Sequence, residues 1–242
     1  MFKSAPLPDN VVAIKKKPFA WSYSRVKNYE TCPRRYKGID IDREYKQEES
    51  EELGEGQRLH LAMAKRVRDD APLPPEFYYM EKYAAALTKI DYTGQSINCE
   101  LKLAISKAHS PCGFFDKDVW ARCVIDYIKF INKDGRQFAH IVDYKTGKLV
   151  EDDTQLAVNA HLVFCCFKNV IGIKSEFLWT KYSDTTSIIF TRESIKEYWG
   201  NLMPRVEKLA QAHIDDNFPP TPCKLCKEWC AVDTCEFHGI GK

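Results

Sequence analysis

The stretch "ARCVIDYIKFINKDGRQFAHIVDYKT", residues 121–146, decides the fold of this 242-residue chain. Its two halves are short and rich in β-branched and aromatic residues, which is typical of strands. The segment "NKDGRQ" between them predicts a hairpin turn, because Asp-Gly favours the tight turns that join antiparallel strands. We therefore expect two adjacent antiparallel strands here.

The same stretch places two acids and a lysine at one end of the predicted strand pair. Asp126 and Asp143 each follow two aliphatic residues, in "VIDY" and "IVDY", so the hairpin brings them side by side. Residues two apart in a strand point to the same face, so Lys145 projects beside Asp143 while Tyr144 points the other way. Two converging carboxylates suit a hard divalent cation such as magnesium, and the lysine suits charge stabilisation at a phosphate.

A simpler interpretation is an exposed ion pair between Asp143 and Lys145, which contributes little to stability. Asp126 favours the metal site, because a carboxylate within the apolar run "CVIDYI" is costly to bury without a partner. Tyr144 is expected to pack, or to offer its backbone carbonyl to the metal.

Three further polar residues belong to the candidate site. Glu100 lies within the strand-like "INCELKLAI", and His60 shares a helical stripe with small and apolar residues, so both are expected near the metal. Gln155 opens an apolar helix after the "TGK" loop, where its amide can reach the lysine or a substrate phosphate. The alternatives are a core histidine at position 60 and an ordinary helix N-terminal residue at position 155.

The remaining patterns predict an α/β domain with a mixed sheet. Helices are expected in residues 24–38, 53–70, 74–90, 153–167 and about 192–214, and further strands in 96–105, 175–182 and 186–191. We divide the chain into an extended arm (1–20), a core domain (21–218) and a cysteine-rich tail (219–242). No run approaches the roughly 18 apolar residues of a membrane span and no apolar signal core is present, so a cytoplasmic protein is expected.

The tail concentrates four of the ten cysteines, Cys223, Cys226, Cys230 and Cys235, together with His238. Thiols clustered in this way in a reducing compartment indicate a metal site. The four tail cysteines suffice for zinc, whereas Cys32 with three of them suits an iron–sulfur cluster. The other five cysteines, which lie among apolar residues, are expected to pack in the core (Cys99, Cys112, Cys123, Cys165 and Cys166).

Six blocks in order, "SYSRVKNYETCPRRYK", "GEGQRLH", "CELKLAI", "ARCVIDY", "HIVDYKTGK" and "TQLAVNA", resemble the PD-(D/E)XK nuclease superfamily, specifically its RecB-like branch. The resemblance implies a restriction-endonuclease-like core with a mixed central sheet flanked by helices. It matches His60 to the metal-binding histidine, Asp126 and Asp143 to the two acids, and Lys145 to the motif lysine. By the same match Gln155 is the glutamine of the following helix, and Glu100 the acid of the earlier strand.

The resemblance also implies magnesium or manganese at the acids and a [4Fe–4S] cluster at the cysteines, with zinc as the alternative. Cys226, Cys230 and Cys235 match the family's tail better than Cys223, and Cys32 matches its early cysteine. Cys123 and Asn159 depart from the family pattern, which has glycine and tyrosine there.

The function expected is a metal-dependent deoxyribonuclease, an exonuclease acting on DNA ends or single strands in repair, recombination or phage DNA metabolism. Lysine plus arginine number 36 against 34 acids, so net charge neither requires nor excludes DNA. Locally, the first fifth of the chain interleaves basic residues with aromatics, which suits single-stranded DNA or equally an ordinary packed helix (Lys15, Lys16, Lys17, Phe19, Trp21, Tyr23, Lys27, Tyr29, Arg34, Arg35, Tyr36 and Lys37).

Two alternatives are a CRISPR-adaptation-type nuclease and a non-catalytic DNA-binding or assembly subunit that keeps the fold. No "GxxxxGK[ST]" motif occurs in the sequence, so unwinding is expected from a partner such as a helicase, with a recombinase or single-strand-binding protein as other possible partners.

Overall fold

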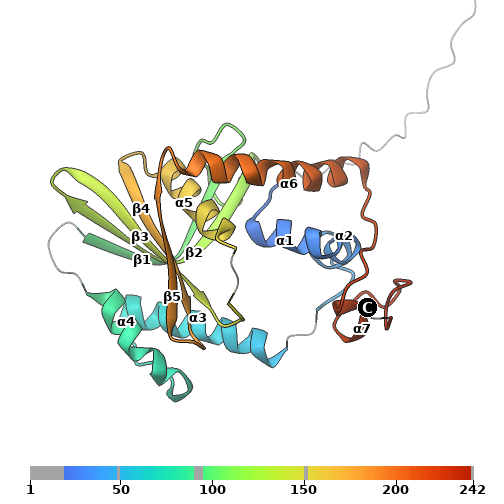
Figure 1. Ribbon diagram of the computed structural model, residues 1–242, viewed down its shortest axis with the longest axis horizontal. Coiled ribbons are helices and arrows are strands. Elements are labelled where there is room, and N and C mark those ends of the chain that lie inside the picture. Colours follow the sequence, from blue (N-terminus) through green and yellow to red (C-terminus); the bar gives the residue numbers. More distant parts are fainter. Residues whose placement is uncertain (1–18, 48–49, 90–94, 150–151, 241–242) are drawn as a thin grey trace, which may run out of the picture.

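A mixed five-stranded sheet organises the molecule, and a computed structural model describes residues 19–47, 50–89, 95–149 and 152–240 of it (Figure 1). The strands follow chain order across the sheet: β1 (Gln95–Ser106), β2 (Val119–Lys133), β3 (Arg136–Lys145), β4 (Val170–Trp179) and β5 (Asp184–Thr191). The β3–β4 pair is parallel and the other three pairs are antiparallel. The mixed sheet expected from the sequence is therefore confirmed.

The β2–β3 hairpin closes as the Asp-Gly pair predicts. Asp134 and Gly135 both have positive φ, 50° and 72°, which a two-residue type I′ turn requires. The resulting register pairs Tyr127 with Val142. Asp126 precedes Tyr127 and Asp143 follows Val142, so in this antiparallel register the two acids are neighbours across the strand pair.

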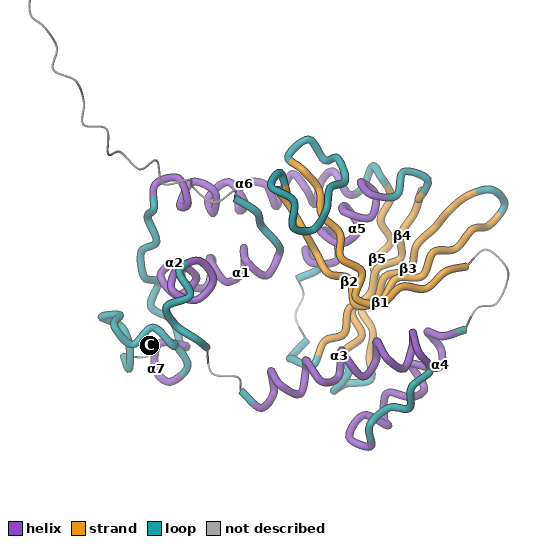
Figure 2. The backbone as a smooth tube through the Cα atoms, turned by 180° about the vertical axis from the view of Figure 1, so that it is seen from behind, coloured by secondary structure: helices purple, strands orange, loops and turns teal. Residues whose placement is uncertain are grey.

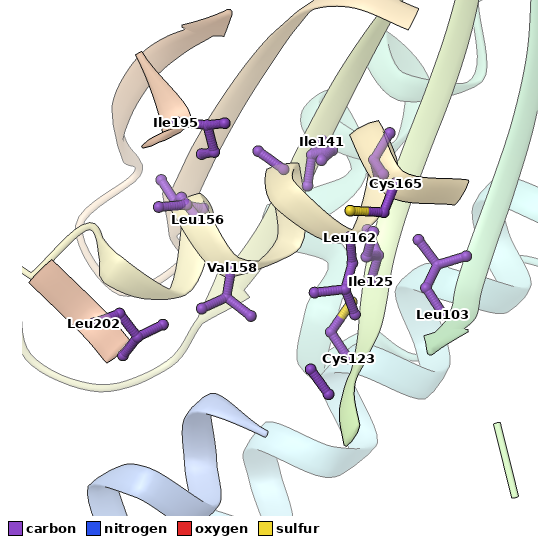
Figure 3. Packing of buried hydrophobic residues seen from close by; sticks show 14 of the residues in the cluster. Leu103, Cys123, Ile125, Ile141, Leu156, Val158, Leu162, Cys165, Ile195 and Leu202 are labelled. Carbon is purple, nitrogen blue, oxygen red and sulfur yellow. The ribbon is translucent and has the colours of Figure 1, made fainter. Parts of the chain in front are cut away.

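Helices cover both faces of the sheet. α5 (Thr154–Cys166) makes the crossover between the parallel strands β3 and β4, and packs with α6 (Ile195–Asp215) over a core that includes Ile125 and Ile141 (Figure 3). A smaller core on the other face is covered by α3 (Glu51–Asp69), the 3₁₀ helix η2 (Pro75–Met80) and α4 (Glu81–Thr88) (Figure 2). None of the described helices combines the length and apolarity needed to cross a membrane.

The first predicted helix is interrupted where its proline indicates. α1 (Tyr23–Thr31) is capped by the Ser22 hydroxyl, which accepts from the Arg25 amide. Cys32 is extended (φ −164°, ψ 111°), and α2 (Pro33–Tyr36) and the π-helical turn η1 (Lys37–Ile41) follow it. Cys32 is extended because the proline that follows it disfavours a helical conformation in the preceding residue.

The tail lies against α2 and the segment after it, at the opposite end of the molecule from α4 (Figure 1). Gln47 donates to the Trp229 carbonyl (2.8 Å), and the Tyr45 hydroxyl lies 2.6 Å from the Thr234 hydroxyl. Apart from the short helix α7 (Leu225–Glu228), the tail has little regular structure. The domain boundaries stay predictions, and nearly all of the predicted arm falls outside the described residues.

The sheet changes the direction of its side chains at Glu100, which has a positive φ of 56° in the middle of β1. Before it, Ile97 and Cys99 contact the core under α3; after it, Leu101 and Leu103 contact the core under α5. A regular strand would keep these odd-numbered residues on one face. The switch places Glu100, and Asp126 opposite it in the register, at the boundary between the two cores.

Candidate active site

Asp126 joins two elements of the site. Its Oδ2 accepts a hydrogen bond from the Tyr144 amide at 2.9 Å, and its Oδ1 lies 3.2 Å from His60 Nδ1. Asp126 is only 8% exposed, so these contacts supply the partners that a buried carboxylate needs. The end of β3 is thereby fixed against β2 and against helix α3, which carries His60.

His60 lies between two acceptors. Its Nε2 is 3.0 Å from the Tyr144 carbonyl oxygen, which only accepts, and its Nδ1 faces the Asp126 carboxylate. Burial lowers the pKa of His60, but the hydrogen bond and the charge of Asp126 outweigh burial and raise the pKa overall. Without a metal, an imidazolium that donates from both nitrogens satisfies this environment best.

Asp143, Lys145 and Gln155 form a second group on the α5 side of the sheet. Lys145 Nζ lies 2.6 Å from Asp143 Oδ2 and donates to Gln155 Oε1 at 2.8 Å. The Gln155 amide nitrogen donates to Asp143 Oδ1 at 2.7 Å. Gln155 therefore bonds both Asp143 and Lys145 and fixes their relative position. An ordinary polar residue at a helix N-terminus would not need either contact.

Asp143 carries a charge in an unfavourable place. It is 3% exposed, and burial followed by repulsion from Asp126 raises its pKa to about 6, although Lys145 and His60 act in the opposite direction. Its Oδ2 contacts the Lys145 ammonium but makes no hydrogen bond among the described residues. When Asp126 and Asp143 are both ionised, they repel each other, and a further positive charge beside them would offset this repulsion.

Glu100 completes the acidic side. A carboxylate oxygen of Glu100, one of Asp126 and a ring nitrogen of His60 all lie within 4.8 Å of one another. Burial and then the charge of Asp126 raise the pKa of Glu100. Two carboxylates and an imidazole thus surround one position, beside the Tyr144 carbonyl that His60 contacts and the Asp143 carboxylate that Asp126 repels. Oxygen donors of this kind suit magnesium or manganese. The donor set fits the metal that the sequence pattern implies.

The predicted cysteine ligands converge from both ends of the chain. Cys32, Cys226, Cys230 and Cys235 line one small cavity together with His238, whereas Cys223 does not line it. The Thr221 amide donates to Cys32 Sγ and the Cys223 amide to Cys226 Sγ, each at 3.4 Å. Two backbone amides are therefore directed at sulfur atoms of this cavity.

A pocket that the sequence reasoning missed opens beside Gln155. It has a volume of about 340 Å³ and is lined by Tyr23, Phe114, Phe115, Arg122, Gln155 and Asn159, among others. Phe115 is 81% exposed, and the Arg122 guanidinium lies 5.1 Å from the ring centre of Phe114. The Asn159 amide nitrogen is buried without a hydrogen-bond partner in the described structure. The adjacent phenylalanines in the polar segment "SPCGFFDKD" were the available signal.

The aromatic residues near the N-terminus mostly serve the core. Trp21 and Tyr36 are 0% and 1% exposed, which leaves neither free to stack on a base. Lys27 pairs with Asp152, Arg34 with Glu236, and Lys37 with Asp42 and Asp216. Of the two interpretations of this segment, packing therefore describes these residues, and Lys15, Lys16 and Lys17 lie outside the described part of the chain.

Comparison with known proteins identifies the family and a similar fold. The family model described as PD-(D/E)XK nuclease superfamily matches residues 20–238. The fold is similar to the crystal structure of a putative exonuclease from Eubacterium rectale, at a TM-score of 0.50 and 14% identity over 96% of this chain and 92% of that one. The structure of the protein SSO0001 is more distant, with a TM-score of 0.37 and 12% identity over 90% and 86% of the two chains. No curated protein sequence matches the chain.

Proposed function

The chain belongs to the PD-(D/E)XK nuclease superfamily, and from this we propose that it is a magnesium- or manganese-dependent deoxyribonuclease that removes nucleotides from DNA ends or single strands. One observation carries the proposal. Asp126 and Asp143 meet across the β2–β3 pair, and each is already bound by the group its proposed role requires, His60 for the first and Lys145 for the second.

Each residue has a separate task in this proposal. Asp126, Asp143, His60, Glu100 and the Tyr144 carbonyl hold the divalent cation, which when bound lowers the pKa of water and offsets charge on the scissile phosphate. Lys145 places its ammonium beside Asp143, where it orients the attacking water or stabilises negative charge on the phosphate. Gln155 positions both side chains through its two hydrogen bonds.

The pocket beside Gln155 supports a single-stranded substrate. Phe114 and Phe115 offer aromatic faces, while Arg122 and Lys102 lie 5.1 and 5.8 Å from the Phe114 ring centre and supply positive charge for phosphate. Stacking aromatics beside cations bind single strands with little sequence preference. A base held there places the neighbouring phosphate toward Gln155 and the acids.

A time course on end-labelled single- and double-stranded DNA, with magnesium or manganese, tests the activity. The wild type is expected to release short products from the label end of a single strand, and Asp143→Ala to release none. Cleavage by Asp143→Ala at the wild-type rate would rule out the proposed centre. Products of internal cleavage on a circular single strand would instead identify an endonuclease.

For the cysteine cavity we propose a [4Fe–4S] cluster held by Cys32, Cys226, Cys230 and Cys235. A single tetrahedral zinc brings its sulfurs to about 3.8 Å from one another, from Zn–S bonds of about 2.3 Å. No three histidine or cysteine ligand atoms of this cavity, all within the described residues, come within 4.8 Å of one another, as the ligands of one zinc ion would. Zinc without iron in anaerobically purified protein would overturn this assignment.

The setting of the reaction is part of the proposal. We place the protein in the cytoplasm, where its ten cysteines, none of them in a disulfide, stay reduced. A helicase or single-strand-binding protein supplies its substrate. Of the alternatives, the complete set of acids, histidine and lysine argues against a non-catalytic subunit. A CRISPR-adaptation nuclease would share the same centre and would differ by binding integration proteins.

A further inference from the structure

Two histidines and a cysteine converge away from the candidate active site, where α5 meets the turn after β1. His161 Nε2 lies 3.1 Å from His109 Nδ1, and Cys165 Sγ lies 3.5 Å from His161 Nε2. All three atoms lie within 4.8 Å of one another. His161 and Cys165 are four residues apart on α5 and share one face, while His109 reaches them from the turn.

These separations match those of ligands around one tetrahedral zinc ion. Zn–N bonds of about 2.0–2.1 Å and a Zn–S bond of about 2.3 Å place two nitrogens roughly 3.3 Å apart, and a nitrogen and a sulfur roughly 3.6 Å apart. Without a metal, the nitrogens of His109 and His161 that face each other share a single proton. A metal ion between them and Cys165 would engage all three atoms.

The two imidazoles are held in place before any ligand arrives. The His161 ring stacks on Trp199 of α6 at 3.7 Å and 18°, and the His109 ring stacks on Trp120 of β2 at 5.6 Å and 26°. His109 also has a positive φ of 58°, a conformation that non-glycine residues rarely adopt. Three elements and one strained backbone position therefore fix the geometry of the cluster.

The surroundings of the two histidines disfavour a positive charge on either ring. Burial, followed by the proximity of His109 and Lys168, lowers the pKa of His161 to about 3, and burial followed by Lys168 lowers the pKa of His109. The exposed Lys168 acts against a bound cation through its positive charge.

We propose that His109, His161 and Cys165 form a second metal site, for zinc or a similar divalent transition metal, with water in the fourth position. Binding releases the thiol proton of Cys165 to solvent, so one proton leaves per ion bound. Nitrogen and sulfur donors select against magnesium, which separates this site from the carboxylate centre. The ion ties α5 to the segment 107–118, which also carries Phe114 and Phe115.

Zinc titration of the full-length protein against a chromophoric chelator tests the site, because it counts tight sites whatever occupies the tail. His109→Ala and Cys165→Ser are each expected to remove one site, or to weaken it on the order of 100-fold. Cys112→Ser, which alters a cysteine of the same segment outside the cluster, is expected to bind like the wild type. Lys168→Ala is expected to bind zinc more tightly.

Tryptophan fluorescence gives an independent readout, since Trp199 and Trp120 stack on the two imidazoles. Cobalt is expected to quench wild-type fluorescence and to quench the His109→Ala protein less. His109 is half-buried in a turn, so this variant remains informative if Cys165→Ser fails to fold. Equal zinc stoichiometry, affinity and cobalt quenching in the wild type and His109→Ala would overturn the proposal, and neither readout depends on nuclease activity.

Discussion

His60 donates from Nε2 to the carbonyl oxygen of Tyr144 at 3.0 Å, and this contact turns its other nitrogen toward Asp126. When protonated, His60 thus uses both ring nitrogens on groups of the proposed metal site, the Asp126 carboxylate and the Tyr144 carbonyl. Asp143 also binds a proton where the metal would need a carboxylate, because its raised pKa keeps it protonated up to about pH 6. Metal binding and proton binding therefore compete at this centre.

Competition between protons and metal predicts the pH dependence of cleavage. His60 and Asp143 both have raised pKa values, so both must lose protons before the metal binds. Activity at limiting manganese is expected to rise as pH passes about 6, where Asp143 titrates, and to go on rising above 6.5, the ordinary pKa of histidine. Raising the manganese concentration is expected to shift the midpoint to lower pH. Initial rates on labelled single-stranded DNA give the profile; a midpoint independent of manganese would contradict the competition.

Replacing Asp143 with asparagine is expected to stabilise the metal-free protein. The pKa of Asp143 is raised from 3.8 to about 6 in the folded state, so the stability of the wild type falls as pH rises from about 4 to 6 and stays reduced above 6. Between pH 5 and 8 the free energy of unfolding of Asp143→Asn is expected to gain about 1 kcal/mol relative to the wild type.

Urea unfolding of both proteins in EDTA, at pH 5 and at pH 8, measures their free energies of unfolding. Subtracting the difference between the two proteins at pH 5 from that at pH 8 removes any effect of the substitution that does not depend on pH. Magnesium is expected to raise the melting temperature of the wild type more than that of Asp143→Asn. A variant that loses stability relative to the wild type from pH 5 to 8 would contradict the burial of an ionisable Asp143.

Loss of Lys145 is expected to slow the chemical step without removing the metal. Lys145→Ala leaves the groups around His60 intact, so kcat is expected to fall by about 10²–10³-fold, the range seen when one charge-stabilising donor is removed. Manganese affinity is expected to change much less. Lys148→Ala is the matched control, because Lys148 is an exposed lysine three residues along the same loop; similar rates for the two variants would exclude the proposed role.

Phe114 and Phe115 are expected to contribute to DNA binding. Stacking on an aromatic side chain is worth about 1–3 kcal/mol per base, so Phe115→Ala is expected to weaken single-stranded DNA binding roughly 5- to 100-fold. Fluorescence anisotropy with a labelled oligonucleotide and calcium in place of magnesium measures the affinity without cleavage. Tyr78→Ala removes an aromatic residue that is 60% exposed on the other side of the sheet and is expected to have no effect.

Cys223 and Cys230 distinguish the candidate ligand sets of the cysteine cavity. Cys230 lines the cavity with Cys32, whereas Cys223 does not, so Cys230→Ser is expected to lose iron and Cys223→Ser to retain it. Cys230→Ser is also expected to melt at a lower temperature, because the link between tail and N-terminal helices is lost. Iron analysis and thermal melts report both effects; iron loss in Cys223→Ser alone would reverse the assignment.

The sequence by itself determined the local elements and the pairing of the two acids. Strand alternation set the face shared by Asp143 and Lys145, and the Asp-Gly turn set the register that brings Asp126 to Asp143, because both effects act over a few residues. The resemblance of six ordered blocks supplied the family, and the family match over residues 20–238 confirms it. Exonuclease polarity and the ligands of each metal stay predictions.

Only the tertiary structure decided the contacts between distant segments. It turned the side chains of β1 at Glu100, and it gathered His109, His161 and Cys165, of which the sequence analysis named only Cys165, as a core residue. Such contacts depend on how the helices pack on a twisted sheet, and no local pattern of hydrophobicity encodes them. The candidate nuclease centre was therefore readable from strand periodicity, and the second metal site was not.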